Sequence, residues 1–228
     1  MKNAMIIAVE GADRAGKATQ VRNIMNYLHG QNIMAQTLDF PQYNAYFGKF
    51  AKDYLNGKYG HFRDLPAEYA MMPYALDRLQ HQPLIKEWLD SGAWIVLDRY
   101  SYSNIFSVAK CPHENWEEKI NYLEDLEFNQ LGLLRPDYNF YLYLPPEISY
   151  QLRNIGGKAA DMGKTDIHEA DFSLQRNTTE AYKYLTERRP QEWSFIDQMQ
   201  GDVRLSADQV FVQKIQPIID RLTRARGE

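Results

Sequence analysis

An apolar segment near the start of the chain runs directly into a loop that contains two glycines. Residues 4–10 read AMIIAVE, and residues 11–19 read GADRAGKAT, which has the spacing G-x-x-x-x-G-K. Glycines in this spacing let backbone N–H groups converge on phosphate oxygens, and the following helix presents its positive N-terminal end to the same anion. Lys17 adds a point charge for the terminal phosphates. The spacing therefore predicts a strand, a phosphate-binding loop and a helix that together bind a nucleoside triphosphate.

The rest of the chain alternates short β-rich runs with amphipathic helical stretches. This alternation is typical of a parallel sheet with helices on its faces. We expect strands at residues 4–9, 32–38, 93–97, 138–144 and 193–197, and helices at 16–28, 47–55, 66–89, 116–131 and on both sides of the last strand. Helix 66–89 is expected as two helices that meet near Gln82-Pro83, since proline disrupts a helix interior. With no repeat or linker, residues 1–228 are expected to form a single α/β domain.

Composition and charge exclude several classes of protein. A net charge of −4 argues against nucleic-acid binding through bulk electrostatics. The single Cys111 excludes an intrachain disulfide framework and fits a reducing cytosol, and the five His residues show no metal-ligand spacing. No apolar stretch is long enough for a signal peptide or a membrane span. We therefore expect a cytoplasmic protein without membrane or nucleic-acid partners.

One position departs from the usual phosphate-loop pattern. Ala18 stands where Ser or Thr commonly binds Mg²⁺, and its methyl group cannot coordinate a metal. Magnesium would then be held by phosphates, water and carboxylates, or by the neighbouring Thr19. A nucleotide-binding regulator without turnover is therefore one alternative for this chain.

Six segments occur in order along the chain and together resemble the thymidylate kinase family. They are GADRAGKATQ at 11–20, FPQY at 40–43, ALDR at 75–78, LDRYS at 97–101, LLRPD at 133–137 and DIHE at 166–169. The resemblance runs from the first strand to about Ile196. It implies the P-loop fold of nucleoside monophosphate kinases, a five-stranded parallel sheet with helices on both faces and a mobile lid. It also implies a homodimer, ATP with Mg²⁺ as the phosphoryl donor and dTMP as the acceptor.

Carried over by position, the resemblance implies roles for residues around the transferred phosphate. Asp98 and Arg99 follow a buried strand, so both should emerge at the sheet edge where ligands of open α/β sheets bind. Arg99 would clamp the acceptor phosphate, and Asp98 would hold Mg²⁺ through water or fix Arg99. Asp13 would contact the sugar 3′-hydroxyl, and Arg14 would reach the transferring phosphoryl group. Lys17, Arg14, Asp13, Arg99 and Asp98 are therefore the expected catalytic residues. The expected ATP-binding residues are Gly11, Ala12, Asp13, Arg14, Ala15, Gly16, Lys17, Ala18, Thr19 and Arg153.

A second group of residues, within the predicted acceptor-base region 70–110 and the Phe-Pro turn, would bind the acceptor. Tyr74 and Arg78 lie four residues apart and so share one helix face. In the family, an aromatic ring at the first position stacks on thymine and the arginine bonds a base carbonyl; here Tyr stands where Phe is more usual. The amide of Asn104, next to Ser103, would read the pyrimidine edge. Phe40-Pro41 resembles the family turn, often with a cis peptide, that lines the sugar pocket, and Tyr43 would face the sugar or phosphate.

The glycine-rich, basic segment 153–166 is expected to be a mobile loop and corresponds to the family's lid. Lys158 and Lys164 would close over the phosphates and exclude water. His168 follows the lid where many relatives carry Tyr beside the sugar 2′ position, which leaves the choice between deoxyribose and ribose open.

The predicted function is ATP-dependent phosphorylation of dTMP to dTDP by direct in-line phosphoryl transfer. The alternatives are a kinase for another monophosphate such as dUMP, favoured by Tyr74 and His168, and the regulator favoured by Ala18.

Overall fold

A central five-stranded parallel sheet organises the computed structural model, which describes residues 4–60, 64–155 and 171–227. The strands are β1 (Ile6–Gly11), β2 (Ala35–Asp39), β3 (Trp94–Asp98), β4 (Tyr138–Tyr143) and β5 (Trp193–Asp197), in the order β2-β3-β1-β4-β5. All pairings between them are parallel. The five predicted strands and the fold class are confirmed, with boundaries that differ by at most three residues. Strands β6 (Met199–Gln200) and β7 (Val203–Arg204) form a small antiparallel hairpin after the sheet.

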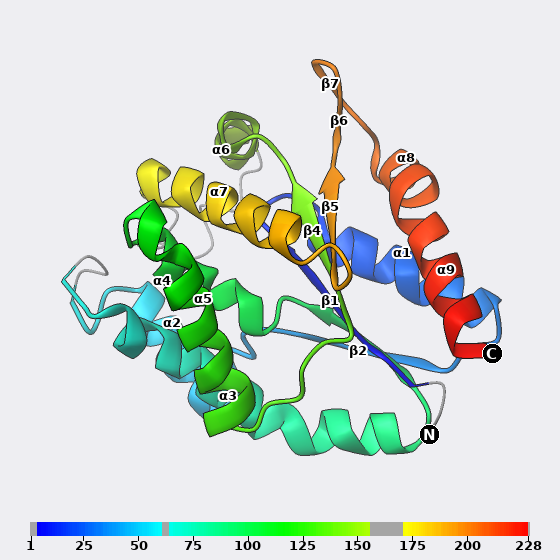
Figure 1. Cartoon of the computed structure of the whole chain (residues 1–228), viewed down its shortest axis with the longest axis horizontal. Coiled ribbons are helices and arrows are strands. Elements are labelled where there is room, and N and C mark those ends of the chain that lie inside the picture. The colour runs from blue at the N-terminus through cyan, green and yellow to red at the C-terminus, as the bar shows by residue number, and fades with distance from the viewer. Residues whose placement is uncertain (1–3, 61–63, 156–170, 228) are drawn as a thin grey trace.

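Helices cover both faces of this sheet (Figure 1). They are α1 (Lys17–Gly30), α2 (Tyr46–Leu55), α3 (Ala67–Asp90), α4 (Phe106–Ala109), α5 (Trp116–Glu124), α6 (Pro146–Ile155), α7 (Phe172–Arg188), α8 (Ala207–Val210) and α9 (Gln216–Gly227). A 3₁₀ turn at Ser101–Ile105 precedes α4, and π-helical segments at Asp125–Gln130 and Phe211–Ile215 continue α5 and α8. None of the described helices is long and apolar enough to cross a membrane.

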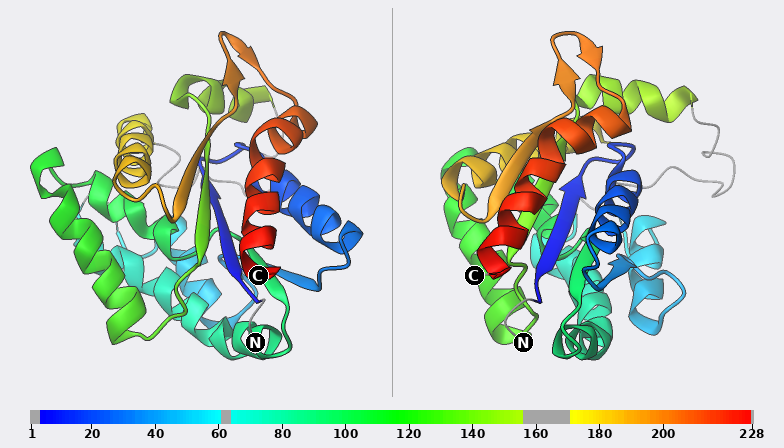
Figure 2. Two further views of the ribbon diagram at one scale, coloured as in Figure 1. Left: turned by 45° about the vertical axis from the view of Figure 1, so that its right-hand side comes forward. Right: turned by 90° about the vertical axis from the view of Figure 1, so that its right-hand side faces the viewer.

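The two faces of β1 pack against different helices, as its alternating side chains dictate. Ile7 and Val9 belong to a core formed with α1 and α9, which lie together on one side of the sheet (Figure 2). Ile6 and Ala8 belong to a core on the opposite side, formed with the second half of α3. A third core joins α2, the start of α3, α4, α5 and α7. The inner strands β1, β3 and β4 are therefore buried, whereas the edge strand β2 is largely exposed, and the carboxyl ends of the strands are where ligands of open α/β sheets bind.

The prediction of two helices in 66–89 was wrong, because α3 continues through Pro73 and Pro83. Packing on both sides of Pro83 accounts for this continuity. Ile85 is fully buried beyond it, and Gln82 before it donates a hydrogen bond to the carbonyl of Gly132 and accepts one from the N–H of Leu134. Tertiary contacts thus outweigh the backbone hydrogen bond that the proline removes.

Candidate active site

The loop between β1 and α1 adopts the strand–loop–helix placement that its spacing predicts. Gly11 is required by close packing, since a Cβ there would lie 2.8 Å from the carbonyl oxygen of Leu142. Gly16 has φ +85° and caps α1, a conformation that glycine adopts without strain. The first backbone N–H groups of α1 therefore face the loop, as an anion-binding helix start requires.

Lys17 is buried beneath this loop. Its ammonium group donates hydrogen bonds to the carbonyl oxygens of Gly11 (3.1 Å) and Ala12 (2.9 Å) and lies 3.9 Å from the carboxylate of Asp13. Burial and the nearby positive charge of Arg99 lower the pKa of Lys17 to about 8, against the opposing effect of Asp13. The lysine is thus held in place by the loop before any phosphate arrives.

Asp13 and Arg99 form an ion pair where three hollows of the surface meet. Arg99 also donates to the carbonyl of Gly11 (3.2 Å), and its own N–H donates to Val9 (3.0 Å). Its φ of +67° is unusual for a residue with a side chain and costs about 1–3 kcal/mol. This strained backbone turns the guanidinium from the end of β3 toward the phosphate loop.

The first of these hollows, the P-loop hollow, has about 760 Å³ of empty space. The residues that line it come from the loop, from the start of α1 and from the ends of β2 and β3: Asp13, Arg14, Gly16, Lys17, Ala18, Thr19, Asp39, Phe40, Pro41, Tyr43, Asp98 and Arg99. It therefore brings six of the predicted loop residues together with Asp98 and Arg99. Gly11 and Ala12 line the third of these hollows instead, and Ala15 is fully buried.

Two carboxylates in the P-loop hollow provide a donor set for a cation. Asp39 and Asp98 are register partners at the ends of neighbouring strands, and Asp39 was not predicted because strand 32–38 was expected to stop one residue earlier. Burial raises the pKa of Asp98, and the charges of Lys17 and Arg99 act against that rise. Mg²⁺ binds through one or two carboxylates together with substrate phosphates, so this pair, with Thr19 nearby, fits that metal. Among the described residues no cluster of three metal-binding side chains occurs.

The second hollow, the α3 hollow, has about 640 Å³ of empty space and brings together the predicted acceptor residues. Asp13, Phe40, Pro41, Tyr43, Leu55, Tyr74, Asp77, Arg78, Arg99, Tyr100, Ser103, Asn104 and Phe106 line it. The Phe40-Pro41 peptide bond is cis, as the resemblance led us to expect. The ring of Tyr74 is fixed by edge contacts with Tyr54 and Phe106, at centroid distances of 6.0 Å each.

A buried polar cluster lies behind the α3 hollow. Arg78 forms an ion pair with Glu127, and the amide of Asn104 donates to the same carboxylate at 2.6 Å. All three side chains are essentially inaccessible to solvent. Glu127 was not predicted, and nothing in the local pattern DLEFNQ distinguishes it from a surface glutamate.

A second unpredicted carboxylate, Glu10, lies at the end of β1. It is fully buried and accepts hydrogen bonds from the backbone of Tyr100 (2.8 Å), the hydroxyl of Ser103 (2.6 Å) and the hydroxyl of Tyr182 (3.0 Å). Burial raises its pKa, while Ser103 and the charge of Arg99 act in the opposite direction. An acid inside an otherwise apolar strand was the sequence signal for this residue. Ser103, predicted to bind the acceptor, thus lies at the hollow while its hydroxyl is used by Glu10.

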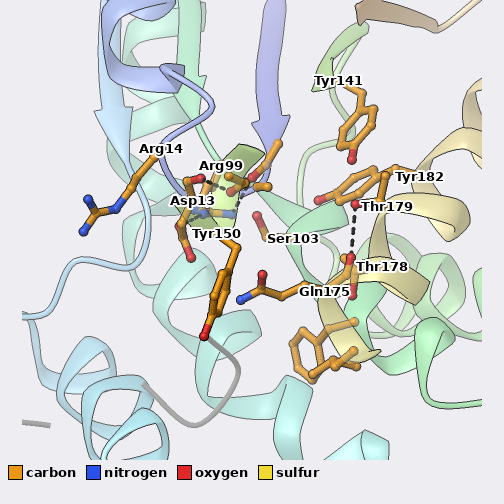
Figure 3. A pocket seen from close by; sticks show the side chains of 15 residues that line it. Asp13, Arg14, Arg99, Ser103, Tyr141, Tyr150, Gln175, Thr178, Thr179 and Tyr182 are labelled. Carbon is orange, nitrogen blue, oxygen red and sulfur yellow. Dashed lines mark hydrogen bonds and ion pairs between the residues drawn. The ribbon is translucent and has the colours of Figure 1, made fainter. Parts of the chain in front are cut away.

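The third hollow, the α7 hollow, has about 810 Å³ of empty space and adjoins the other two at Asp13 and Arg99 (Figure 3). Its wall includes the rings of Tyr141 and Tyr182, stacked with centroids 4.3 Å apart, and Gln175 of α7. No residue of α7 had been predicted as part of the site.

Arg14 is directed away from Asp13 and Arg99 in the same view (Figure 3). Its guanidinium donates to the carbonyl of Leu152 in α6 at 2.7 Å, and the hydroxyl of Ser149 in α6 donates to the carbonyl of Asp13 at 2.8 Å. The phosphate loop and α6 are therefore linked by two hydrogen bonds. Arg153 lies in α6, but its side chain is outside the described part, and Lys158, Lys164, His168 and most of the predicted lid lie outside the described residues.

Comparisons with known proteins point to one family. A family model described as thymidylate kinase matches residues 9–209. The chain is 33% identical over 186 residues to the thymidylate kinase of Mycobacterium tuberculosis (strain H37Rv), covering 79% of this chain and 85% of that protein. It is 29% identical over 183 residues to the thymidylate kinase of Plasmodium falciparum, covering 80% and 78%. The solved structure of a thymidylate kinase from Candida albicans, described as having broad substrate specificity, matches with a TM-score of 0.73 at 23% identity, covering 99% of this chain and 94% of that one.

Proposed function

The chain belongs to the thymidylate kinase family, and on that premise we propose that it transfers the γ-phosphoryl group of ATP directly to dTMP, giving dTDP and ADP. It is an enzyme of the nucleoside monophosphate kinase class. The observation that carries the proposal is the position of the Asp13–Arg99 ion pair, where the hollow lined by Lys17 meets the hollow lined by Tyr74 and Arg78.

In this proposal the P-loop hollow holds the phosphates that take part in transfer. The loop N–H groups and Lys17 bind the donor phosphates, exchanging the hydrogen bonds that Lys17 makes to Gly11 and Ala12 for bonds to phosphate oxygens. Asp98 and Asp39 would hold Mg²⁺, which when bound neutralises charge on the donor phosphates. Ala18 contributes no hydroxyl, so the carboxylates of the strand ends take the larger share of cation binding.

Arg99 is the proposed clamp for the acceptor phosphate. Its planar guanidinium suits bidentate contact with a phosphate, and Asp13 and the Gly11 carbonyl already fix its direction. Positioning two anionic reactants in line is the main task in phosphoryl transfer, because the protein forms no covalent bond to the group. Asp13 would meet the sugar 3′-hydroxyl from the same junction.

Arg14 and the lid residues complete the proposal. Arg14 would leave the Leu152 carbonyl and reach the transferring group when ATP is bound, adding charge where it develops in the transition state. Arg153, Lys158, Lys164 and His168 keep the roles that the resemblance implies.

The α3 hollow is the proposed site for the acceptor nucleoside. Tyr74 would stack on the base, Arg78 and Asn104 would bind its edge, and Phe40, Pro41 and Tyr43 would line the sugar and phosphate side. Ser103 contributes to the same wall.

A coupled assay of ADP release over a panel of monophosphates tests this function. With ATP and Mg²⁺ we expect dTMP to give the highest kcat/KM, with Lys17→Ala as the low-activity control. A higher kcat/KM for dUMP or another monophosphate would show that thymidylate is not the preferred substrate. Tight ATP binding with no turnover of any monophosphate would instead support the regulator, which Ala18 favours.

We also propose that the enzyme acts in the cytoplasm as a homodimer. Helix α2 exposes Tyr46 and Phe50, which pack with Phe47 as an aromatic cluster on the surface of the single chain. Sedimentation equilibrium should give twice the chain mass, and Phe50→Ser should shift the distribution toward the monomer.

A further inference from the structure

Glu127 is a fully buried carboxylate that contacts two residues of the proposed base site without lining that site itself. Its Oε2 accepts a hydrogen bond from Nε of Arg78 at 3.0 Å, and its Oε1 pairs with Nη2 of the same arginine. Oε1 also accepts a hydrogen bond from Nδ2 of Asn104 at 2.6 Å. One carboxylate in the π-helical segment Asp125–Gln130 therefore contacts two of the side chains that line the α3 hollow.

For Arg78, the pairing fixes which edge of the guanidinium is used. Nε and Nη2 lie on one edge and are both bound to Glu127. Nη1 is the third nitrogen of the guanidinium and does not bind Glu127. None of the described residues accepts a hydrogen bond from it. Because a guanidinium can only donate, the arginine offers a donor to the α3 hollow.

For Asn104, the same carboxylate fixes which end of the amide is left without a partner among the described residues. Nδ2 lies between two acceptors, Oε1 of Glu127 and the carbonyl of Met71 at 3.3 Å. A flipped amide would put its oxygen against both acceptors, so the orientation is determined by chemistry. The remaining oxygen, Oδ1, is buried and has no hydrogen-bond partner within the described part of the chain. Asn104, which lines the α3 hollow, therefore has an acceptor left over, as Arg78 has a donor left over.

We propose that Glu127 is a positioning residue that sets the hydrogen-bonding polarity of the base site, so that the site takes 4-oxopyrimidines and rejects 4-aminopyrimidines. The inference rests on the proposed function in one respect, that the α3 hollow holds the acceptor base. A 4-oxopyrimidine such as thymine or uracil presents an N3–H donor next to a carbonyl acceptor, which matches Oδ1 of Asn104 and Nη1 of Arg78. Cytosine presents an acceptor at N3 and a donor at its 4-amino group. With cytosine bound, Oδ1 of Asn104 would face an acceptor and Nη1 of Arg78 would face a donor, so neither buried group could form its hydrogen bond.

The test compares Glu127→Gln with Glu124→Gln, a matched control. Glu124 is also a buried glutamate, three residues earlier, but its partners are Tyr102, Arg135 and Arg189 and it does not line the α3 hollow. A glutamine at 127 can present an oxygen or an amine, so the amide of Asn104 is released to flip and Arg78 loses its charged partner. The readouts are kcat/KM for dTMP and dCMP and calorimetric binding of each monophosphate without ATP.

Wild-type protein should prefer dTMP over dCMP by a factor on the order of 10⁴, as sites built around hydrogen bonds to a substrate do. Glu127→Gln should reduce that ratio about 100-fold, mainly through the KM for dTMP, while the KM for ATP changes by about twofold or less. Glu124→Gln should leave the ratio within about twofold.

Equal changes in the two variants would overturn the inference, because a merely structural glutamate would behave like Glu124. Wild-type binding of dCMP as tight as that of dTMP would overturn it as well. If wild-type protein bound dTMP selectively yet phosphorylated no monophosphate, the proposed function would fail while the inference stood. Should Glu127→Gln fail to fold, Glu127→Asp keeps the charge but is one methylene shorter, and it should lower the ratio about tenfold with Arg78 still paired.

Discussion

The P-loop hollow and the α3 hollow share Asp13, Phe40, Pro41, Tyr43 and Arg99, yet different structural elements form the rest of each. The P-loop hollow is formed by a loop, a helix start and two strand ends, and its buried cation, Lys17, is held by loop carbonyl groups. The ion pair that the two hollows share is partly open to solvent, with Asp13 54% exposed and Arg99 25% exposed. The α3 hollow is backed by Arg78, Asn104 and Glu127, which are closed off from solvent.

The difference reflects two tasks: one hollow suits the binding of charged phosphates, and the other suits the recognition of one base among similar bases. Phosphate oxygens are alike in every nucleotide, so converging N–H groups and a few cations suffice to bind them. A base edge must be distinguished from similar edges, and that requires donors and acceptors whose orientation is fixed by burial and by partners. Removing one member of a buried ion pair costs about 3–5 kcal/mol, so the α3 hollow is rigid where the P-loop hollow can adapt.

The largest expected effect comes from Lys17→Ala in the P-loop hollow. Because Lys17 is the buried cation next to the loop carbonyls, we expect kcat/KM for ATP to fall about 1,000-fold. Steady-state kinetics at saturating Mg²⁺ measures this change. Calorimetric affinity for dTMP should stay within about threefold, because the α3 hollow is untouched. A matching loss of dTMP affinity would show that the two hollows are not separable.

Arg99→Ala should have the next largest effect, because Arg99 lines both hollows. We expect kcat/KM for dTMP to fall about 100-fold and the KM for ATP to change little. Arg99→Lys, which keeps the charge without the planar fork, should recover only part of the loss. Near-normal kcat/KM in Arg99→Ala would remove its assigned role as the acceptor-phosphate clamp.

As the pH rises, the use of ATP at the P-loop hollow should weaken before the binding of dTMP at the α3 hollow does. Burial and Arg99 lower the pKa of Lys17 to about 8, so the lysine is charged below that pH and becomes neutral above it. We expect kcat/KM for ATP to fall above pH 8 by up to about tenfold per pH unit, while dTMP affinity follows a flatter profile. The residual activity of Lys17→Ala should lack this limb of the profile. An unchanged profile up to pH 10 would show that Lys17 keeps its proton in the free enzyme.

The smallest effect is expected from Ala18→Ser, which restores the usual hydroxyl to the P-loop hollow. Ala18 is exposed at the start of α1, so the added oxygen meets no packing barrier. We expect kcat to stay within about threefold and the half-saturating Mg²⁺ concentration to fall. Titration of activity against Mg²⁺ measures both. Complete inactivation would mean that the site had adapted around alanine.

Sequence reasoning was therefore most complete for the P-loop hollow. The spacing of Gly11, Gly16 and Lys17 places them correctly because all three lie in one continuous strand–loop–helix segment. Asp98 and Arg99 were found because parallel strands end at the same edge of the sheet. Tyr74 and Arg78 were predicted from the resemblance to the family, with which their helix spacing agrees, and both line the α3 hollow.

The sequence by itself determined the sheet, the phosphate loop and the order of the motifs, since each depends on neighbours along the chain. Only the tertiary structure decided that Glu127 meets Arg78 and Asn104, residues 49 and 23 positions away, and that Glu10 meets Tyr182 across 172 positions. It also decided that α3 passes through Pro83 as one helix. The physical reason is common to all three: these outcomes depend on burial and on partners brought together by packing, and no local spacing encodes which distant side chain will be there.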